Sequence, residues 1–363
     1  MYLDTETYQE ALKLLKKYPS TTRSAEFRRL IKNLLFSKPF YLDHFAWPNA
    51  LLAIGIEYWD RTQTQKMLRD ALQSFYQMWS DKKIKIVSQD DILSGYSLLY
   101  LYEMTKEPGL LEHADYCLQY LESHRKTTTN ILPYRAGQPN EVFVDTIGIV
   151  VPFLARYARV RKNQKAARMA TDQIIAFLEH GMDSKTGLPY HGYHISDGNK
   201  QGIIGWGRAC GWLLIGMAEY LIEIRDTQYH ELFPGEYVRI REAFSDLLQT
   251  VETYRMPDGM FCWQLEAKEG PIDTSATAFI LFAMLRAAQN SLVNKQHVIT
   301  FAENTLEALA SFQSSGGIGN CSGECEGFGR YPQIYAPYPW SLGPAIAADS
   351  ILEILKTNQE GCL

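Results

Sequence analysis

The sequence contains only six cysteines, and no two of them form a CxxC pair. Cys321 and Cys325 are close neighbours, but a zinc site would need two more well-spaced ligands beside them, and the sequence offers no such pair. A disulfide framework is not evident either, and reduced thiols are the default in a cytosolic protein. We therefore expect free cysteines, no metal site and no cofactor.

Long apolar runs and an excess of positive charge are also missing. No stretch has the length and apolarity of a membrane span. The N-terminal MYLDTETYQEALKLLKKYP carries charges throughout, which predicts an amphipathic helix rather than a signal peptide. The net charge of −5 does not favour nucleic acid or a basic membrane patch as a partner. We expect a cytoplasmic protein that binds neither nucleic acid nor membrane.

Strand signals are scarce, and helical periodicity dominates the chain. The best strand candidates are IKIVS at 84–88 and MFCWQL at 260–265. The predicted helices lie at about 5–17, 23–36, 47–60, 63–79, 91–105, 108–124, 143–160, 163–181, 206–225, 237–255, 273–289, 296–313 and 342–357. Short connections with Gly, Pro or Asn separate most of them, so sequential helices should pair antiparallel.

Polar clusters precede several apolar helices and recur roughly every 50 to 65 residues. They are QDDILSG near 90–96, EVFVDTIG near 141–148, IIGWGRACGW near 203–212 and GPIDTSATA near 270–278. If the helical hairpins form a ring, all of these clusters lie at the same end. About a dozen helices in six hairpins predict an all-α, (α/α)6 barrel. An open solenoid is the alternative, but the connections are unequal and no 34-residue pattern recurs.

Asp145 is the acid in an apolar stretch, EVFVDTIGIVVPFLARYA at 141–158. A fold that buries its neighbours carries this carboxyl into or beside an apolar environment, where an unpartnered carboxyl tends to keep its proton. Such an acid can donate a proton near neutral pH. The alternative is a helix N-cap, with Thr146 beside it.

Other clusters offer further candidate site residues. Asp90 opens a helix with Asp91, either as a cap or beside a ligand. Tyr190 and His191 lie in DSKTGLPYHGYHISD at 183–197, and such loops flank many sugar sites, although an exposed loop is the alternative.

Tryptophans frame the next cluster. In WGRACGW, Trp206 and Trp212 could stack on sugar faces, and Arg208 could hold a carboxylate by two parallel hydrogen bonds. The alternative is a tightly packed helix start. Further on, Trp263 could face a cleft and Asp273 would cap a helix. The glycine-dense GGIGNCSGECEGFGR lacks the Lys-Ser/Thr of a phosphate loop, so nucleotide binding is not expected.

The order of these clusters resembles the unsaturated glycuronyl hydrolases of glycoside hydrolase families 88 and 105, and family 105 most closely, over about residues 40–357. QDDILSG resembles the family's Asp-Asp-(Ile/Val)-x-x-Gly, YHGY its Tyr-His-Gly-Trp, and LGPAIAA its closing Gly-Pro helix. WGRACGW and DTSATA also match family motifs, with departures. Ala209 and Cys210 replace Gly-Asn, His194 stands where an acid commonly follows, and Asp273 replaces a glutamate.

No linker is evident, so we expect a single catalytic domain over 1–363, active as a monomer or homodimer. The resemblance implies that no metal or organic cofactor is required. The implied substrate is an oligosaccharide with a 4,5-unsaturated terminal uronic acid. Asp145 would protonate C4 and then accept a proton from the water that attacks C5, while Asp90 orients the sugar. The implied substrate-binding residues are Tyr190, His191, Trp206, Arg208, Trp212 and Trp263. The alternatives are an inverting glycosidase or epimerase on the same barrel, or a non-catalytic carbohydrate-binding or scaffold protein.

Overall fold

The computed structural model describes residues 1–16, 46–63, 65–82, 85–86, 88–124, 131–135 and 137–360. The helix expected at about 23–36 and part of the strand candidate at 84–88 lie outside these residues. All other predicted helices have a counterpart in the described part of the chain, with bounds shifted by a few residues.

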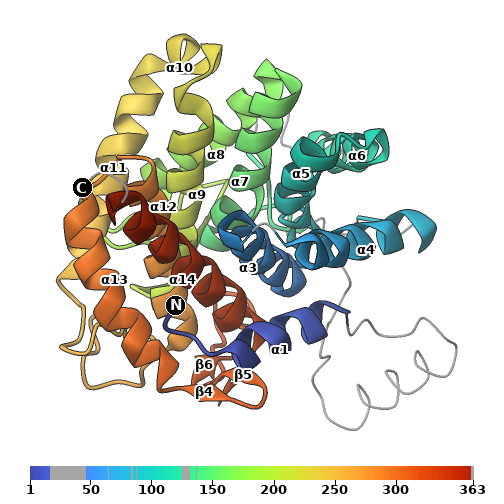
Figure 1. Ribbon diagram of the computed structural model, residues 1–363. Coiled ribbons are helices and arrows are strands. Elements are labelled where there is room, and N and C mark those ends of the chain that lie inside the picture. Colours follow the sequence, from blue (N-terminus) through green and yellow to red (C-terminus); the bar gives the residue numbers. More distant parts are fainter. Residues whose placement is uncertain are drawn as a thin grey trace, which may run out of the picture.

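Helices of the inner ring are apolar around most of their circumference. They are α3 (Trp47–Gln63), α5 (Ser94–Thr105), α7 (Val144–Arg161), α9 (Gly207–Arg225), α12 (Thr274–Gln289) and α14 (Pro339–Glu360). Each packs on the next in chain order, and α14 packs on α3, which closes the ring (Figure 1). Nearly every side chain of α9 is buried, as a helix with neighbours on all sides requires.

Helices of the outer layer are amphipathic and bury one face against the inner ring. They are α1 (Thr5–Lys16), α4 (Lys66–Lys82), α6 (Pro108–His124), α8 (Gln164–His180), α11 (Pro234–Glu252) and α13 (Lys295–Ala310). The short α10 (Gln228–Leu232) precedes α11. The predicted (α/α)6 barrel is confirmed.

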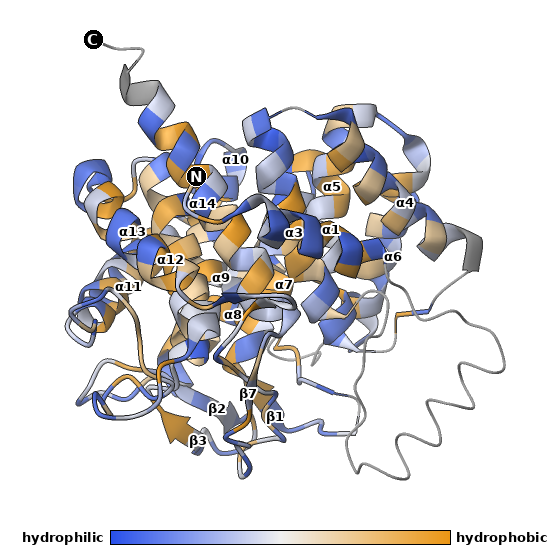
Figure 2. Ribbon diagram, turned by 60° about the horizontal axis from the view of Figure 1, so that its bottom comes forward, coloured by the Kyte–Doolittle hydropathy of each residue, from blue (hydrophilic) through white to orange (hydrophobic). Residues whose placement is uncertain are grey.

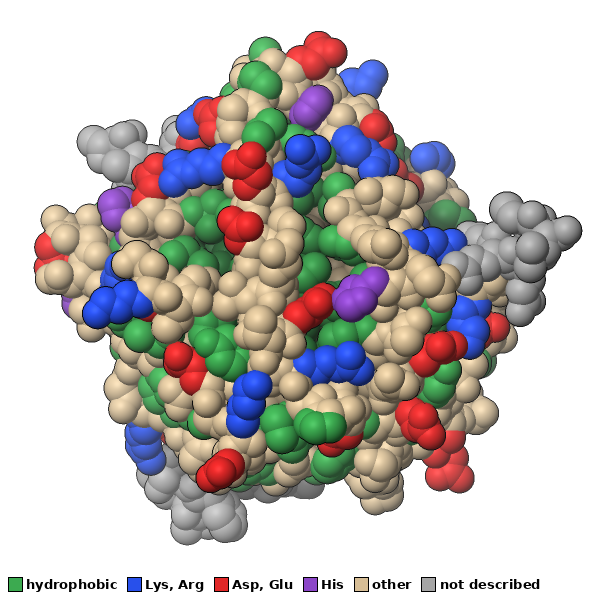
Figure 3. Space-filling view, turned by 90° about the vertical axis from the view of Figure 1, so that its left-hand side faces the viewer, with side chains coloured by type: hydrophobic (Ala, Val, Ile, Leu, Met, Phe, Trp, Pro, Cys, Tyr) green, Lys and Arg blue, Asp and Glu red, His purple; other side chains and the backbone are tan. Residues whose placement is uncertain are grey.

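On the face turned to the left in Figure 1, acidic and basic side chains are interspersed (Figure 3).

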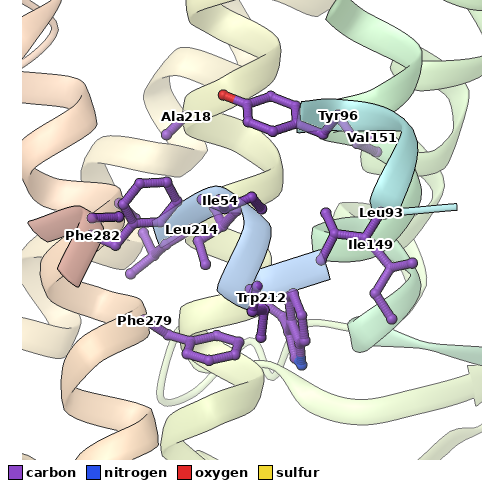
Figure 4. Packing of buried hydrophobic residues seen from close by; sticks show 14 of the residues in the cluster. Ile54, Leu93, Tyr96, Ile149, Val151, Trp212, Leu214, Ala218, Phe279 and Phe282 are labelled. Carbon is purple, nitrogen blue, oxygen red and sulfur yellow. The ribbon is translucent and has the colours of Figure 1, made fainter. Parts of the chain in front are cut away.

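Large apolar side chains fill the space between the inner helices. Figure 4 shows Ile54 of α3, Trp212 of α9 and Phe279 of α12 among them. A Cβ at Gly148 of α7 would lie 2.3 Å from the Trp212 ring, so only glycine lets α7 approach α9 this closely. Figure 2 shows the same apolar concentration along the central helices.

Two buried arginines link the inner helices to one another. Arg156 of α7 donates to Glu223 of α9 at 2.9 Å and to Glu57 of α3 at 3.0 Å. Arg286 of α12 donates to Glu219 of α9 at 2.6 Å. Arg156 lies 11 positions after Asp145 on α7, about 16 Å along the helix axis. These ion pairs therefore lie toward the end of the ring opposite Asp145.

The two ends of the chain form the sixth hairpin, because α1 packs on both α14 and α3. Asp349 of α14 accepts hydrogen bonds from the backbone N–H of Tyr2 at 2.9 Å and of Leu3 at 3.0 Å. It also accepts one from the Tyr8 hydroxyl at 3.0 Å. A buried carboxylate thus fastens the first residues to the last inner helix.

Short strands gather at one end of the ring (Figures 1 and 2). The strands β1 (Glu141–Phe143), β2 (Tyr190–His194) and β3 (Lys200–Ile204) form an antiparallel sheet in that order. The two-stranded sheets are β4 (Gln313–Ser314) with β5 (Gly317–Ile318), and β6 (Cys321–Ser322) with β7 (Tyr335–Ala336).

The strand prediction at 260–265 is wrong. This segment makes only isolated bridges, Cys262 with Ile272 and Trp206 with Gln264. The three-stranded sheet lies instead partly in residues that the sequence predicts as a loop. No helix in the described ranges combines the length and the apolarity needed to cross a membrane.

Candidate active site

Asp145 and His191 form the centre of the candidate site. Asp145 is in the first turn of α7, directly after β1, and β1 pairs with β2 so that Phe143 lies opposite Gly192. This pairing brings Asp145 Oδ2 to 3.1 Å from His191 Nε2. The imidazole is fully buried, whereas the Asp145 side chain is 16% exposed. The N-cap of α7 is Phe143, so Asp145 does not serve as that cap.

Asp90 lies beside this pair, in the 3-10 turn η1 (Gln89–Asp91) that precedes α5. Its Oδ1 accepts a hydrogen bond from the Tyr134 hydroxyl at 2.8 Å, and Arg135 Nη2 lies 3.7 Å from its Oδ2. Burial raises the pKa of Asp90, and the negative charge of Asp145 adds to this shift, while Tyr134 and Arg135 oppose it. The negative charge of Asp145 therefore favours the protonated form of Asp90.

Residues 322–331, which we call the covering segment, lie over His191. Tyr331 Oη is 2.8 Å from Nδ1 of the imidazole, and Cys325 Sγ is 3.7 Å from Nε2. Phe328 stacks on Phe143 with ring centroids 4.0 Å apart. Burial raises the pKa of the Cys325 thiol, which keeps it neutral.

Two glycines of the sheet allow the covering segment to approach. A Cβ at Gly192 would lie 2.6 Å from the Phe328 ring, and one at Gly202 would lie 2.6 Å from Tyr331 Oη. Gly202 also has a φ of +78°, which L side chains rarely adopt. The YHGY motif thus needs its glycine because the Val142 carbonyl of β1 and the Phe328 ring both lie where a Cβ would be.

Arg208 and Asp273 anchor the start of the covering segment to α9 and α12. Arg208 Nη1 donates to the Ser322 carbonyl at 2.9 Å, and Nη2 donates to the Gly323 carbonyl at 2.8 Å. Asp273 Oδ2 accepts from Ser322 Oγ at 2.7 Å, and Oδ1 accepts from the Ser275 N–H at 2.9 Å as the cap of α12. The role of Arg208 in holding a substrate carboxylate stays a prediction.

Aromatic candidates divide into two groups. Trp206 contacts His191 with ring centroids 4.9 Å apart, and half-buried Trp263 lies 5.8 Å from the Tyr331 ring. Trp212 lies in the core, where its ring meets Phe279 at 4.5 Å and is 1% exposed.

Tyr190 neighbours Lys200, whose Nζ is 5.6 Å from the Tyr190 ring centroid. Tyr190 directly precedes His191 on β2, but within the described part of the chain its side chain makes no hydrogen bond or ring contact with Asp145 or His191. The structure therefore brings together Asp90, Asp145, His191, Trp206 and Trp263, and leaves Trp212 and Tyr190 apart from them.

Several residues around His191 and Asp90 are not predicted from the sequence. They are Tyr134, Phe143, Cys325, Phe328 and Tyr331. One signal for the last three is available, because a loop that precedes an inner helix must lie at the same end of the ring as the other helix starts. The described residues contain no group of three His, Cys, Asp or Glu side chains placed to hold a metal ion.

Comparison with known proteins gives concordant similarities. The model of a family described as Glycosyl Hydrolase Family 88 matches residues 32–348. The unsaturated rhamnogalacturonyl hydrolase YesR of Bacillus subtilis is 22% identical over 346 residues, which cover 90% of this chain and 94% of that protein.

Solved structures are similar over nearly the whole chain. A possible member of the GH105 family from Klebsiella pneumoniae has a TM-score of 0.78 at 16% identity, covering 97% of this chain and 92% of its own. The unsaturated glucuronyl hydrolase of Bacillus sp. GL1 has a TM-score of 0.71 at 15% identity, and the match covers 98% of this chain and 97% of that chain. At these identities the similarity concerns the fold.

Proposed function

Because this chain belongs to glycosyl hydrolase family 88, we propose that it releases a 4,5-unsaturated uronic acid from the non-reducing end of oligosaccharides produced by polysaccharide lyases. The curated relative is, by its name, an unsaturated rhamnogalacturonyl hydrolase. The observation that carries the proposal is the partly exposed Asp145 carboxyl, hydrogen-bonded to buried His191 at 3.1 Å.

In the proposed reaction Asp145 acts first as an acid and then as a base. It gives its proton to C4 of the C4–C5 double bond, and the positive charge that develops at C5 is shared with the ring oxygen. Water then adds to C5 as Asp145 takes up the proton that the water loses. The product is a hemiketal at C5, which opens and releases the aglycone. Asp145 ends in its starting protonation state.

Asp90 orients the sugar in this proposal and affects the proton on Asp145. Its carboxyl is 16% exposed and is fixed by the Tyr134 hydroxyl, which leaves Oδ2 facing the more distant Arg135. Burial is the main cause of the raised pKa of Asp90, and the charge of Asp145 adds to it, so the protonation of Asp90 responds to the charge on Asp145.

His191, Trp206 and Trp263 are the proposed lining of the sugar site. Arg208 Nη1 donates to Ser275 and Ser322, whereas Nη2 gives one of its two hydrogens to the Gly323 carbonyl. A uronate carboxylate would be held by two parallel hydrogen bonds from Nε and the second hydrogen of Nη2.

We also propose a single catalytic domain over residues 1–363, active in the cytoplasm as a monomer or homodimer. The family match spans residues 32–348, from before α3 into α14, which supports one domain. Cysteines among the described residues carry free thiols, which fits a reducing compartment: Cys117, Cys210, Cys262, Cys321 and Cys325.

An ultraviolet assay on lyase digests tests the proposed reaction, because hydration removes the conjugated double bond and its absorbance. We expect absorbance to fall with at least one digest of a panel that covers glucuronyl and galacturonyl ends. The matched control is the same oligosaccharide with a saturated terminal uronate, which should not be cleaved. Cleavage of the saturated substrate would indicate an ordinary glycosidase, and binding without cleavage of either would indicate a carbohydrate-binding protein.

A further inference from the structure

The hydroxyl of Tyr331 occupies a position between two nitrogens. It accepts a hydrogen bond from the backbone N–H of Ile203 at 3.2 Å, and it lies 2.8 Å from Nδ1 of His191. The other ring nitrogen, Nε2, faces Asp145 at 3.1 Å. A continuous hydrogen-bonded row therefore runs from β3 through Tyr331 and His191 to Asp145.

The row has one consistent arrangement when Asp145 is ionised. A carboxylate only accepts hydrogen bonds, so Nε2 must carry the hydrogen that lies between the two groups. A neutral imidazole with a hydrogen on Nε2 has a bare lone pair on Nδ1. Tyr331 then donates its own hydrogen to Nδ1 while it accepts from Ile203. Every polar atom in the row has a partner.

His191 occupies Oδ2 of Asp145, so the catalytic proton is carried on the other carboxyl oxygen, Oδ1. A proton on Oδ1 leaves the row unchanged, because Nε2 still donates to Oδ2. Only a proton on the imidazole itself changes Nδ1, which then becomes a buried donor at hydrogen-bond distance from Tyr331 Oη.

We propose that Tyr331 is a positioning residue for the proton transfer by Asp145: its hydroxyl donates to Nδ1 of His191 and so keeps the imidazole hydrogen on Nε2, directed at Asp145 Oδ2, while Oδ1 gives and regains the catalytic proton. The inference rests on the proposed function for the identity of the reaction. His191 and Tyr331 keep their hydrogens throughout, and the proton that Asp145 gives to C4 returns from water.

Asp90, Tyr134 and Cys325 interact electrostatically with Asp145. Arg135 acts in turn on Asp90 and Tyr134, and Arg208 and Glu324 act on Cys325. Replacing Tyr331 by Phe keeps all of them and also keeps the ring that packs on Trp206 and Trp263. A change in titration therefore reports on the lost hydroxyl.

Nuclear magnetic resonance of histidine-labelled protein tests the row without any substrate. The His191→Gln variant identifies the His191 signal in the spectrum. At a pH above the titration of His191, the wild-type imidazole should carry its hydrogen on Nε2 and none on Nδ1. Tyr331→Phe should shift the His191 titration to lower pH by about half a unit or more, because an unpartnered buried N–H is disfavoured. Hydrogen on Nδ1 above the titration in the wild type would overturn the proposal.

Kinetics provide the second readout, with Tyr335→Phe as the matched control. Tyr335 is in the neighbouring strand β7, and its hydroxyl bonds to Gln333 instead of His191. We expect Tyr331→Phe to lower kcat about tenfold, the effect of about one hydrogen bond, with little change in KM. The basic limb of its pH–rate profile should move to lower pH. Equal effects of both substitutions, or a KM effect alone, would assign Tyr331 a merely structural role.

The two readouts separate the inference from the proposed function. If the wild type removes no absorbance from any lyase digest, the reaction is wrong, yet the spectrum still decides whether Tyr331 sets the hydrogen position on His191. If the wild type is active and Tyr331→Phe leaves the spectrum, kcat and pH profile unchanged, only the inference is wrong.

Discussion

Asp90 and Asp91 are adjacent in the chain but have different tasks. Asp91 accepts a hydrogen bond from the Ser88 N–H and closes a capping box on η1. Asp90 accepts from the Tyr134 hydroxyl and experiences the charge of Asp145. The capping role and the site role, which are alternatives for one acid pair at the sequence level, are thus divided between the two residues.

Asp145→Asn is the decisive substitution at the residue scale. The amide is nearly isosteric and can still bond to His191, so the melting temperature should change little. Turnover should fall by at least about 10², as expected when a general acid or base is removed. Both quantities are measured on one protein preparation with a digest that the wild type hydrolyses.

Asp91→Asn is the control for this substitution. It weakens the cap of η1, so we expect a loss of about 1 kcal/mol of stability with nearly normal turnover. A folded Asp145→Asn enzyme with wild-type turnover would remove Asp145 from the mechanism.

The covering segment and the sheet β1–β2–β3 are the elements that build the site around the helices. The sheet fixes Asp145 and His191 relative to each other, and the covering segment supplies Tyr331, Phe328 and Cys325. The segment is itself held at Ser322 by Arg208 and Asp273. Arg208 of α9 and Asp273, the N-cap of α12, therefore connect the inner helices to the segment that supplies Tyr331.

Ser322→Ala should loosen the covering segment. The substitution removes a hydrogen bond from Oγ to Asp273 at 2.7 Å and one from Arg208 to Oγ at 3.0 Å. Because buried Asp273 and Arg208 would each lose a hydrogen bond, the free energy of unfolding should fall by about 1–3 kcal/mol, measured by urea unfolding. We also expect KM to rise more than kcat falls.

Ser314→Ala is the matched control, because that hydroxyl bonds at the neighbouring β4–β5 turn to the Gly317 carbonyl. It should leave KM unchanged. A rise in KM of the same size in both variants would contradict the anchoring role of Ser322.

How far the sequence predicts these elements depends on the range of the contacts. Local periodicity predicts the helices, and the shared polarity of helix starts predicts that Asp90, Asp145 and Arg208 belong to one end of the ring. The partner of His191 is different, because Tyr331 is 140 residues away in the chain and lies in an irregular segment. The segment 260–265 looks like a strand, but Trp263 and its neighbours form single bridges to two different segments.

At the scale of the molecule, the ring is closed where α14 meets α3 and α1. Asp349 holds this junction through three donors, two of them backbone N–H groups. Burial raises the pKa of Asp349, and the hydrogen bonds from Tyr2, Leu3 and Tyr8 oppose that shift. The stability of the junction therefore depends on the hydrogen bonds that this one carboxyl accepts.

Asp349→Ala should destabilise the whole fold, because it leaves two backbone donors and the Tyr8 hydroxyl without their acceptor. We expect a loss of about 2–4 kcal/mol in the free energy of unfolding, measured with urea. Tyr8→Phe, which removes one of the three bonds, should cost about 1 kcal/mol.

Glu353→Gln is the control for the junction. Glu353 is on the same helix and pairs with the N-terminal amino group at 3.3 Å, but its side chain is 43% exposed. Its loss should be nearly neutral, since exposed ion pairs contribute little. Equal destabilisation by Asp349→Ala and Glu353→Gln would contradict the role given to the buried carboxyl.

Closure by the last inner helix has a consequence for synthesis on the ribosome. The nascent chain makes α3 first among the inner helices and α14 last, so the flanks of α3 and α12 that α14 covers stay exposed until translation has passed residue 360. Exposed apolar helix flanks make incomplete chains prone to aggregation. Newly made protein should therefore need chaperone protection most just before α14 emerges, and a ribosome stalled in the covering segment would hold a nearly complete chain that is neither closed nor active.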